Sequence, residues 1–259
     1  MNLLCIVQAR MDSSRFPGKV LADLAGYPIL EHVVTRAQAA GLPVVVATTD
    51  REVDDPIAAW AVTAGVKLFR WDGPVEDVLC RYIACAEEYD ADAIMRITGD
   101  SPFVPIETIY VVVQQLRMGG NTVVAVTSGF GVVPDGWEAE GCLTDWLRYL
   151  NGSHPSASER EHVFPGIYTR AITSAVTAPT ALVTGSTVGY SGLTVPPTQW
   201  NQPWLMDQKF SVDSPEDLDW LRSIAQRLDC TPPLPTVQDL ISLLSEHPEL
   251  QRPLVESST

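Results

Sequence analysis

Positive charge is scarce in this sequence. Its 259 residues include 17 lysines and arginines against 32 aspartates and glutamates, which gives a formal net charge of −15. A nucleic-acid partner would require a broad basic surface that neutralises phosphates. The acidic balance therefore argues against nucleic-acid binding.

Long apolar runs are missing as well. None approaches the ~18 residues of a membrane-spanning helix, so we expect no membrane association. No basic segment precedes the apolar residues 3–7, which argues against a secretory signal peptide. The five cysteines are an odd number without a C-x-x-C pair. They indicate reduced thiols in the cytoplasm, with neither a disulfide framework nor a zinc site.

Two familiar phosphate-binding loops are also absent. No glycine lies five residues before Gly18, and Val20 stands where a Walker loop has serine or threonine. The nearest match to a dinucleotide-binding G-x-G-x-x-G is Gly-Phe-Gly at 129–131, which lacks the third glycine. The sequence contains neither a G-x-S-x-G motif nor a Cys/His pattern that would indicate covalent catalysis. Kinase and hydride-transfer activities are therefore disfavoured.

The first half of the sequence alternates short apolar segments with longer amphipathic ones. This alternation predicts an α/β fold with a Rossmann-like open, mostly parallel sheet and helices on both faces. The expected strands are residues 3–8, 44–47, 66–69, 93–97 and 122–126, and the expected helices are residues 29–39, 54–64, 75–89 and 105–118.

We expect one domain over residues 1–259. The alternation breaks between residues 128 and 205, where the sequence predicts a single helix near 143–151. We interpret 128–205 as an insertion for acceptor specificity or dimer contacts. Order returns with a predicted short strand at 210–212, followed by Ser214, Pro215 and Asp217. These three residues are typical of a capped helix start.

The loop after the first predicted strand concentrates cations. The stretch LLCIVQARMDSSRFPGKVL places Arg10, Arg15 and Lys19 within ten residues, and Pro17-Gly18 turns Lys19 back towards the two arginines. Ligands bind beyond the carboxyl ends of parallel strands. Arginine offers planar contacts to phosphate oxygens, and lysine adds a compact charge. The loop therefore fits a polyphosphate, although a solvated surface loop would look similar.

Two aspartates are expected at the same edge of the sheet. Asp100 follows the strand predicted at 93–97, and Asp213 follows the one predicted at 210–212. Two carboxylates at neighbouring strand ends can share a divalent ion, or each can simply end a strand or cap a helix. Asp90 and Asp92 form a D-x-D that precedes a strand, so we interpret them as a turn at the opposite edge.

The motif QARMDSSRFPGKVL resembles the A-R-x-x-S-x-R-x-P-G-K signature of the sugar-acid cytidylyltransferases. The resemblance is closest to the spore-coat polysaccharide biosynthesis branch, with the 3-deoxy-manno-octulosonate and acylneuraminate enzymes as relatives. It covers most of the chain, continuing through DDPIAAWA, EDVLCRY, RITGDSP, PDGWEAE, EREHV and FSVDSPEDLDWLR, in the family's order.

The resemblance implies a single nucleotidyltransferase domain that transfers CMP from CTP to a small acceptor, with a sugar acid favoured and pyrophosphate released. It implies a Mg²⁺ ion held by Asp100 and Asp213, and a homodimer. The residues expected to act in catalysis are Arg10, Arg15, Lys19 and Asp100. Those expected to bind the nucleotide are Ala9, Arg10, Ser13, Ser14, Arg15, Lys19 and Thr98, and those expected to bind the acceptor are Asp77, Arg81, Glu140 and His162.

Several assignments have alternatives. The i, i+4 spacing of Asp77 and Arg81 also allows a surface ion pair. Lys209 could contact a phosphate or be an ordinary surface lysine, and the role of Arg96 is open. The family patterns GLDVE and HVTPYIY are replaced here by GWEAE and HVFPGIY. These departures concern the acceptor rather than the nucleotide.

Three other functions compete with this hypothesis. A cytidylyltransferase for a phosphonate or polyol-phosphate acceptor would keep the same loop and metal site. A glycosyltransferase of the same fold would use a D-x-D after a strand. A non-catalytic module would bind CTP without turnover.

Overall fold

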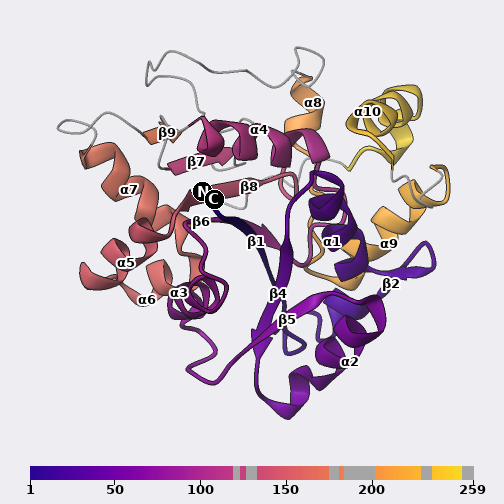
Figure 1. Cartoon of the computed structure of the whole chain (residues 1–259). Coiled ribbons are helices and arrows are strands. Elements are labelled where there is room, and N and C mark those ends of the chain that lie inside the picture. Colours follow the sequence, from indigo (N-terminus) through magenta and orange to yellow (C-terminus); the bar gives the residue numbers. More distant parts are fainter. Residues whose placement is uncertain (119–122, 127–132, 175–180, 184–201, 229–234, 253–259) are drawn as a thin grey trace.

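The computed structural model describes residues 1–118, 123–126, 133–174, 181–183, 202–228 and 235–252 (Figure 1). A central sheet runs through the molecule, with helices packed on both of its faces. Within the described residues, no helix is long and apolar enough to cross a membrane.

The central sheet contains seven strands of the described chain, in the order β5-β4-β1-β6-β8-β7-β9. Only β8 runs against its neighbours; β1 pairs in parallel with β4 and β6, β4 with β5, and β7 with β9. The strands are β1 Leu3–Gln8, β4 Val44–Thr49, β5 Lys67–Trp71, β6 Ala93–Thr98, β7 Val123–Val126, β8 Ala139–Leu143 and β9 Ala181–Val183. A separate hairpin joins β2 Asp23–Leu24 to β3 Tyr27–Pro28.

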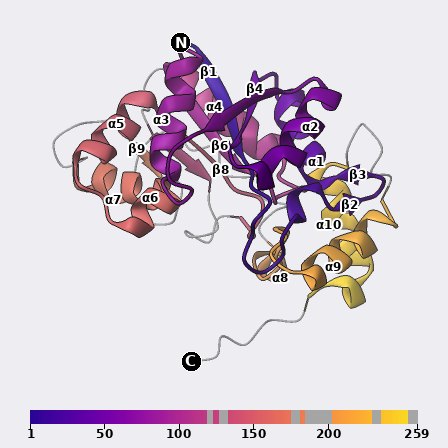
Figure 2. The ribbon, with the colours of Figure 1, turned by 90° about the horizontal axis from the view of Figure 1, so that it is seen from below.

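The helices divide between the two faces of the sheet. One face is covered by α1 Ile29–Ala39, α2 Asp55–Ala64, α4 Ile106–Arg117, α9 Pro215–Ala225 and α10 Val237–Glu246. The other is covered by α3 Val78–Glu88, α5 Thr144–Gly152 and α7 Phe164–Ser174. The short helices are α6 Ala157–His162 and α8 Pro203–Met206. Figure 2 shows α5, α6 and α7 at one end of the molecule and α9 and α10 at the other.

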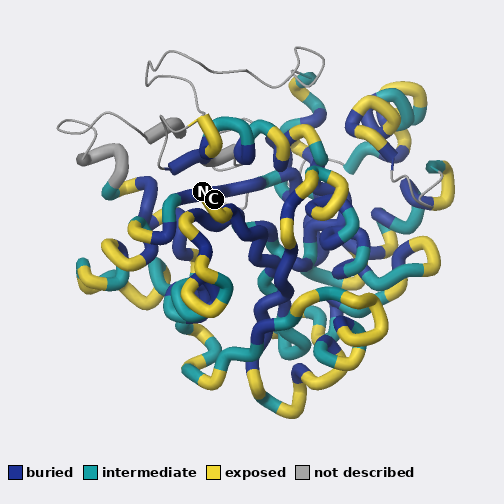
Figure 3. Tube along the Cα trace, in the orientation of Figure 1, coloured by how far each residue is buried: buried dark blue, intermediate teal, exposed yellow. Residues whose placement is uncertain are grey.

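Side chains of the central strands alternate between two cores. In β1, Leu3, Cys5 and Val7 pack under α1 and α4, whereas Leu4 and Ile6 pack under α3. All five are buried, and Figure 3 shows the buried trace running through the middle of the sheet. A strand buried on both faces needs an unbroken apolar run, which is why LLCIV reads as continuous rather than alternating.

The predicted fold class is confirmed. The strand at 3–8 and the helix at 29–39 have the predicted bounds, and the other predicted strands and helices of the first half lie within a few residues of their places. Residue 122, expected in a strand, lies outside the described residues. The capped helix start is also confirmed, because Ser214 and Asp217 form a capping box with Pro215 in the first turn of α9.

Two local predictions were wrong. Residues 210–212 form no strand. They extend beside the loop at Asp135, and an isolated bridge joins Asp135 to Lys209 there. The described part of 128–205 is also more regular than predicted, because it contains β8, β9, α6, α7 and α8 in addition to α5. Since β8 lies between β6 and β7, this part of the segment belongs to the central sheet.

The strand register brings the functional segments to one edge. Gln8 at the end of β1 lies beside Thr98 at the end of β6, so the loop after Gln8 and the turn at Asp100 emerge together. Because β8 runs in the opposite direction, its beginning lies at this edge, and Glu140 pairs in register with Arg96.

Candidate functional site

A cavity of about 310 Å³, here called the first cavity, opens at the carboxyl edge of β1 and β6. It is lined by all seven residues that the sequence assigns to nucleotide binding: Ala9, Arg10, Ser13, Ser14, Arg15, Lys19 and Thr98. The lining also includes Arg81 and His162, which were predicted to bind the acceptor, and Asp100 and Asp213, which were predicted to bind the metal.

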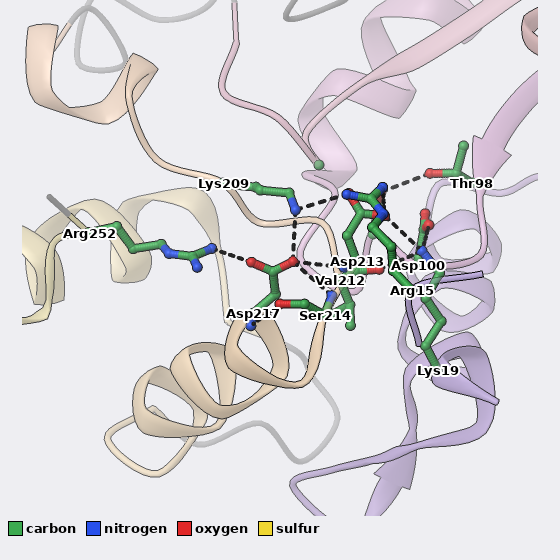
Figure 4. A network of polar contacts seen from close by, with 12 residues as sticks. Arg15, Lys19, Thr98, Asp100, Lys209, Val212, Asp213, Ser214, Asp217 and Arg252 are labelled. Carbon is green, nitrogen blue, oxygen red and sulfur yellow. Dashed lines mark hydrogen bonds and ion pairs between the residues drawn. The ribbon is translucent and has the colours of Figure 1, made fainter. Parts of the chain in front are cut away.

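Lys19 joins the cationic loop to the two aspartates (Figure 4). Its ammonium lies 2.5 Å from Asp100 Oδ2 and 3.1 Å from Asp213 Oδ1, and it donates to the Val212 carbonyl at 2.6 Å. The Lys19 side chain is buried, so these partners compensate a charge that would otherwise be desolvated. The predicted meeting of Lys19, Asp100 and Asp213 therefore occurs in the structure.

Asp213 is at the centre of a wider ion-pair network. Arg15 contacts Asp213 at 2.9 Å, and Lys209 contacts it at 3.0 Å (Figure 4). Burial alone would raise the pKa of Asp213, but Lys209 and Lys19 hold this pKa below its usual range. The Asp213 carboxylate therefore stays ionised, as a cation ligand must.

Asp217 secures the segment that carries Asp213. It accepts from the Asp213 and Ser214 backbone amides at 2.8 and 3.0 Å and pairs with Lys209 and Arg252 at 2.7 and 2.6 Å. Burial opposes its ionisation, yet these donors lower the pKa of Asp217 to about 2. Lys209 thus makes ion pairs with Asp213 and Asp217, and a phosphate contact is not needed to explain it.

The signature loop is held by a turn at Gly18 and by Asp54, to which the sequence analysis assigned no role. Gly18, at a positive φ of 77°, donates to the Met11 carbonyl at 2.6 Å and closes the loop. The Met11 amide donates to Asp54 Oδ1 at 2.7 Å. Asp54 is fully buried and also accepts from the Thr49 hydroxyl. It anchors the loop to β4 and α2.

Arg10 and Arg81 both line the first cavity. Arg10 pairs with the exposed Glu76 at 3.0 Å. Arg81 is buried and donates to the Val75 carbonyl at 2.6 Å, while its Nε has no hydrogen-bond partner in the described structure. Burial lowers the pKa of Arg81, as does nearby Arg10. A buried arginine with a spare donor at the cavity wall suits an anionic ligand.

Asp77 lies outside this arrangement. It caps α3 by accepting from the Cys80 amide at 3.1 Å, and it pairs with Arg160 at 3.0 Å. The alternative ion pair with Arg81 is not formed, because Arg81 turns to the Val75 carbonyl instead. Asp77 is not among the lining residues of the first cavity.

A second cavity of about 330 Å³ shares Thr98, Asp100, His162 and Asp213 with the first. Arg96 and Glu140 lie in its wall and form an ion pair of 2.6 Å. Burial would lower the pKa of Arg96, but Glu140 outweighs it and the pKa is raised. The other oxygen of Glu140 accepts from the Tyr168 hydroxyl, which leaves Glu140 held from two sides.

Asp135 enters the second cavity on a closely packed turn. Gly136 has φ +89°, and a Cβ there would lie 2.4 Å from the Phe210 carbonyl carbon, so only glycine fits. The Phe210 amide donates to the Asp135 carbonyl at 2.7 Å, which ties this turn to the segment that carries Asp213. Burial raises the pKa of Asp135 despite a hydrogen bond from Ser211. Asp135 lies in the family-like motif PDGWEAE, but the motif did not assign a role to its side chain.

The donor set of Asp100 and Asp213 fits a magnesium ion. The two carboxylates converge closely enough for the Lys19 ammonium to contact both. No group of three metal-binding side chains occurs within the described residues. Mg²⁺ typically takes one or two protein carboxylates and completes its shell with water and phosphate oxygens. The D-x-D aspartates are elsewhere: Asp92 accepts from the Asn2 amide at the start of β1, at the opposite edge.

The fold and the site together define the α/β nucleotidyltransferase class: a mostly parallel sheet whose carboxyl edge places a cationic loop opposite two carboxylates. The chain belongs to the cytidylyltransferase family, whose model matches residues 4–172.

Relatives and solved structures agree with this assignment. The chain is 38% identical to the Bacillus subtilis spore coat polysaccharide biosynthesis protein SpsF over 119 residues, covering 44% of this chain and 49% of SpsF. It is 34% identical to the 3-deoxy-manno-octulosonate cytidylyltransferase of Idiomarina loihiensis, covering 45% of this chain and 46% of that enzyme. The chain thus spans about half the length of these curated relatives.

Two solved structures share the fold. A cytidylyltransferase from Leptospira borgpetersenii superposes with a TM-score of 0.80 at 23% identity, covering 97% of both chains. A CMP:2-keto-3-deoxy-manno-octonic acid synthetase complexed with CTP superposes with a TM-score of 0.58 at 21% identity, covering 88% of this chain and 100% of the synthetase.

Proposed function

We propose that this protein is a Mg²⁺-dependent cytidylyltransferase that transfers CMP from CTP to a small acceptor and releases pyrophosphate. One observation carries the proposal: Lys19 from the signature loop reaches both Asp100 and Asp213 at the rim of the first cavity. Cationic groups for a triphosphate and carboxylates for its counter-ion are therefore within one ligand's reach.

The first cavity is the proposed CTP site. Arg10, Arg15 and Lys19 hold the triphosphate, and Arg81 adds a buried charge at the wall. Donors that already point at the reacting phosphate stabilise the charge that builds up during transfer. Ala9, Ser13, Ser14 and Thr98 complete the lining. The choice of CTP over other nucleotides rests on family membership.

Asp100 and Asp213 are the proposed magnesium ligands. When bound, the ion would neutralise the triphosphate and polarise the α-phosphate. Lys19 holds the two carboxylates together, and Lys209 and Lys19 keep Asp213 ionised, while Arg15 adds an ion pair. Asp217 fixes the backbone on which Asp213 stands.

The transfer is an in-line displacement. An acceptor hydroxyl in the second cavity forms a bond to the α-phosphorus of CTP, the bond from that phosphorus to the bridging oxygen breaks, and pyrophosphate leaves. The hydroxyl proton passes to solvent. Glu140 and His162 line the second cavity and are the proposed acceptor contacts. The relatives named for 3-deoxy-manno-octulosonate support a sugar acid as one acceptor class.

A pyrophosphate assay tests this function. Purified protein is mixed with Mg²⁺, a panel of sugars and sugar acids, and each of the four nucleoside triphosphates separately. We expect acceptor-dependent pyrophosphate release with CTP. Release that requires UTP, GTP or dTTP together with a sugar phosphate would move the protein to another nucleotidyltransferase activity. CTP binding by calorimetry without any turnover would indicate a binding module.

The family resemblance also favours a homodimer, and we include one in the proposal. Light scattering after size exclusion would measure a mass near twice the chain's 28.3 kDa if this is correct.

A further inference from the structure

Gln8 is a polar residue on a strand face that is otherwise apolar. It ends β1, and its side chain follows Leu4 and Ile6 on the sheet face that α3 covers. Leu4 and Ile6 pack in the core there, whereas Gln8 is half-buried and lines the first cavity. Its amide therefore lies where the core ends and the proposed CTP site begins.

The oxygen of the Gln8 amide is already engaged. It accepts from the Tyr82 hydroxyl at 3.1 Å and from Arg96 Nε at 3.4 Å. An arginine N–H can only donate, so the oxygen of the amide, and not its nitrogen, must face Arg96. Burial raises the pKa of Tyr82, which keeps its hydroxyl protonated as a donor. The two donors use both lone pairs of the oxygen and set the direction of the amide.

The nitrogen of the same amide is left for a ligand. It makes no hydrogen bond to any residue that the structure describes, and it is not closed off from solvent. Since Gln8 lines the first cavity, we place this nitrogen at the cavity surface. The amide therefore offers N–H donors to the first cavity and no acceptor.

Gln8 lies on the side of the first cavity that suits a base. The cationic loop continues onto the opposite face of the sheet, where Val20 beside Lys19 packs in the core under α1. On the α3 side, the lining includes Val75 and Val78, whose apolar side chains can cover the flat face of a base. A triphosphate held by Lys19 thus leaves its nucleoside towards Gln8.

We propose that Gln8 selects cytosine over uracil by donating to the pairing edge of the base. The inference rests on the proposed function, because it takes the first cavity as the CTP site. Cytosine has two adjacent acceptors on that edge, N3 and O2, whereas uracil carries an N–H at position 3. The fixed amide can donate to N3 of cytosine, but it would bring N–H against N–H with uracil. Arg81 lines the same cavity and also has donors alone.

Nucleotide analogues test the inference on the wild-type chain. Calorimetry with Mg²⁺ and without an acceptor gives the Kd of CTP, UTP and 3-deaza-CTP, in which a C–H replaces the acceptor N3. The ribose and the triphosphate are the same in all three compounds, so the base alone differs. We expect UTP and 3-deaza-CTP each to bind at least about tenfold more weakly than CTP. Binding of either compound as tight as that of CTP would overturn the inference.

Replacement of Gln8 tests the residue itself. Gln8→Met keeps an unbranched side chain without an N–H, so UTP and 3-deaza-CTP should come within about threefold of CTP. Gln8→Glu offers an acceptor in place of the donors and should shift the preference further towards UTP. Gln38→Met, at an exposed position of α1, is the matched control and should keep the wild-type ratios. Wild-type ratios in Gln8→Met would contradict the inference.

The ratios also separate base recognition from a purely structural role. Gln8 contacts Arg96, which pairs with Glu140 in the wall of the second cavity. If Gln8 acted only by holding Arg96, its loss would change the affinities for the three nucleotides alike. The ratios of their Kd values would then stay as in wild type, which would overturn the inference.

Failure of this inference can be told from failure of the proposed function. If neither CTP nor UTP binds, the proposed function fails. If CTP binds and 3-deaza-CTP binds equally well, the proposed function stands and the role of Gln8 alone fails.

Discussion

At the scale of single residues, Lys19 connects the two parts of the proposed site. Its ammonium contacts a carboxylate from the segment after β6 and another from the segment before α9. The three groups come from positions up to 194 residues apart in the chain. A substitution of Lys19 therefore tests whether the triphosphate loop and the metal site act together.

Replacing Lys19 should disable nucleotide turnover. Lys19→Met removes the charge but keeps an unbranched side chain, and leaves Asp100 and Asp213 facing each other without their shared cation. We expect kcat/KM for CTP in the pyrophosphate assay to fall by about 10²- to 10³-fold. Lys67→Met, on the exposed end of β5, is the matched control. A Lys19 variant within about twofold of wild type would contradict the assigned role.

Asp54 is expected to act through the loop rather than on the ligand. Asp54→Asn weakens the acceptor for the Met11 amide and the Thr49 hydroxyl while preserving side-chain volume. We expect KM for CTP to rise about tenfold with little change in kcat, because the loop is less firmly positioned. Asp55→Asn changes the neighbouring exposed carboxylate and serves as control. A loss confined to kcat would argue against a positioning role.

The residues of the site differ in how far the sequence could predict them. Lys19 and Asp100 were predictable because their segments follow the predicted strands at 3–8 and 93–97, and parallel strands end at a common edge. Residues 210–212 form no strand, so the prediction for Asp213 depends on the family-like motif FSVDSPEDLDWLR. Asp54 and Asp135 lie in the family-like motifs DDPIAAWA and PDGWEAE. The roles of their side chains were not predictable, since the partners are brought close only by folding. The Arg96–Glu140 pair depends on an antiparallel strand that the sequence did not reveal.

At the scale of elements, the start of α9 combines a helix cap with an ion-pair network. Asp217 belongs to the capping box with Ser214 and also pairs with Lys209 and Arg252. A lowered carboxylate pKa means that the folded state binds a proton more weakly than the unfolded state. The stabilisation from Asp217 is therefore present above its unfolded pKa and is lost as pH falls through its folded pKa.

Removing the Asp217 charge should cost stability in a pH-dependent way. We expect Asp217→Asn to lower the free energy of unfolding by about 3 kcal/mol near neutral pH, because Lys209 and Arg252 lose a buried partner. The difference from wild type should shrink between about pH 4 and about pH 2, as the native carboxylate becomes protonated. Urea titrations at several pH values measure this difference in the free energy of unfolding.

The capping box of α10 provides the control for that experiment. Asp239 fills the same helix position beside Thr236 and is exposed, with no ion pair among the described contacts. Asp239→Asn should therefore cost only about 1 kcal/mol. Equal losses at the two helices would show that the network around Asp217 adds nothing to the cap.

Elements of the second half were harder to predict than those of the first for physical reasons. The sequence of β8, AEGCL, has a glutamate and a glycine where a strand pattern expects apolar side chains. Arg96 satisfies that glutamate, and Gly141 lets α4 pack closely, since a Cβ there would lie 2.7 Å from Leu116. Helix α6 is six residues long, too short for a clear helical period.

At the scale of the whole molecule, the C-terminal helices share a core with the first strands. Leu218, Leu221 and Ile224 of α9 belong to the same buried cluster as Leu3 and Val7 of β1. The segment that carries Asp213 is thus packed against the domain that carries Lys19. A single domain over residues 1–259 stays a prediction.

A core substitution tests whether the molecule unfolds as one unit. Leu221 is fully buried, and Leu221→Ala should lower the free energy of unfolding by about 3 kcal/mol. The transition should stay single and coincide when followed by tryptophan fluorescence and by circular dichroism. Separate transitions would mean that the C-terminal helices form an independent unit and that the nucleotide site spans two bodies.

The most direct test of the whole account is calorimetric titration of CTP with and without Mg²⁺. We expect wild-type protein to bind CTP at least about tenfold more tightly with the ion. That gain should be lost in Asp213→Asn and kept in Asp219→Asn, which alters an exposed aspartate on α9. A Mg²⁺-dependent gain that survives in Asp213→Asn would contradict the proposed site.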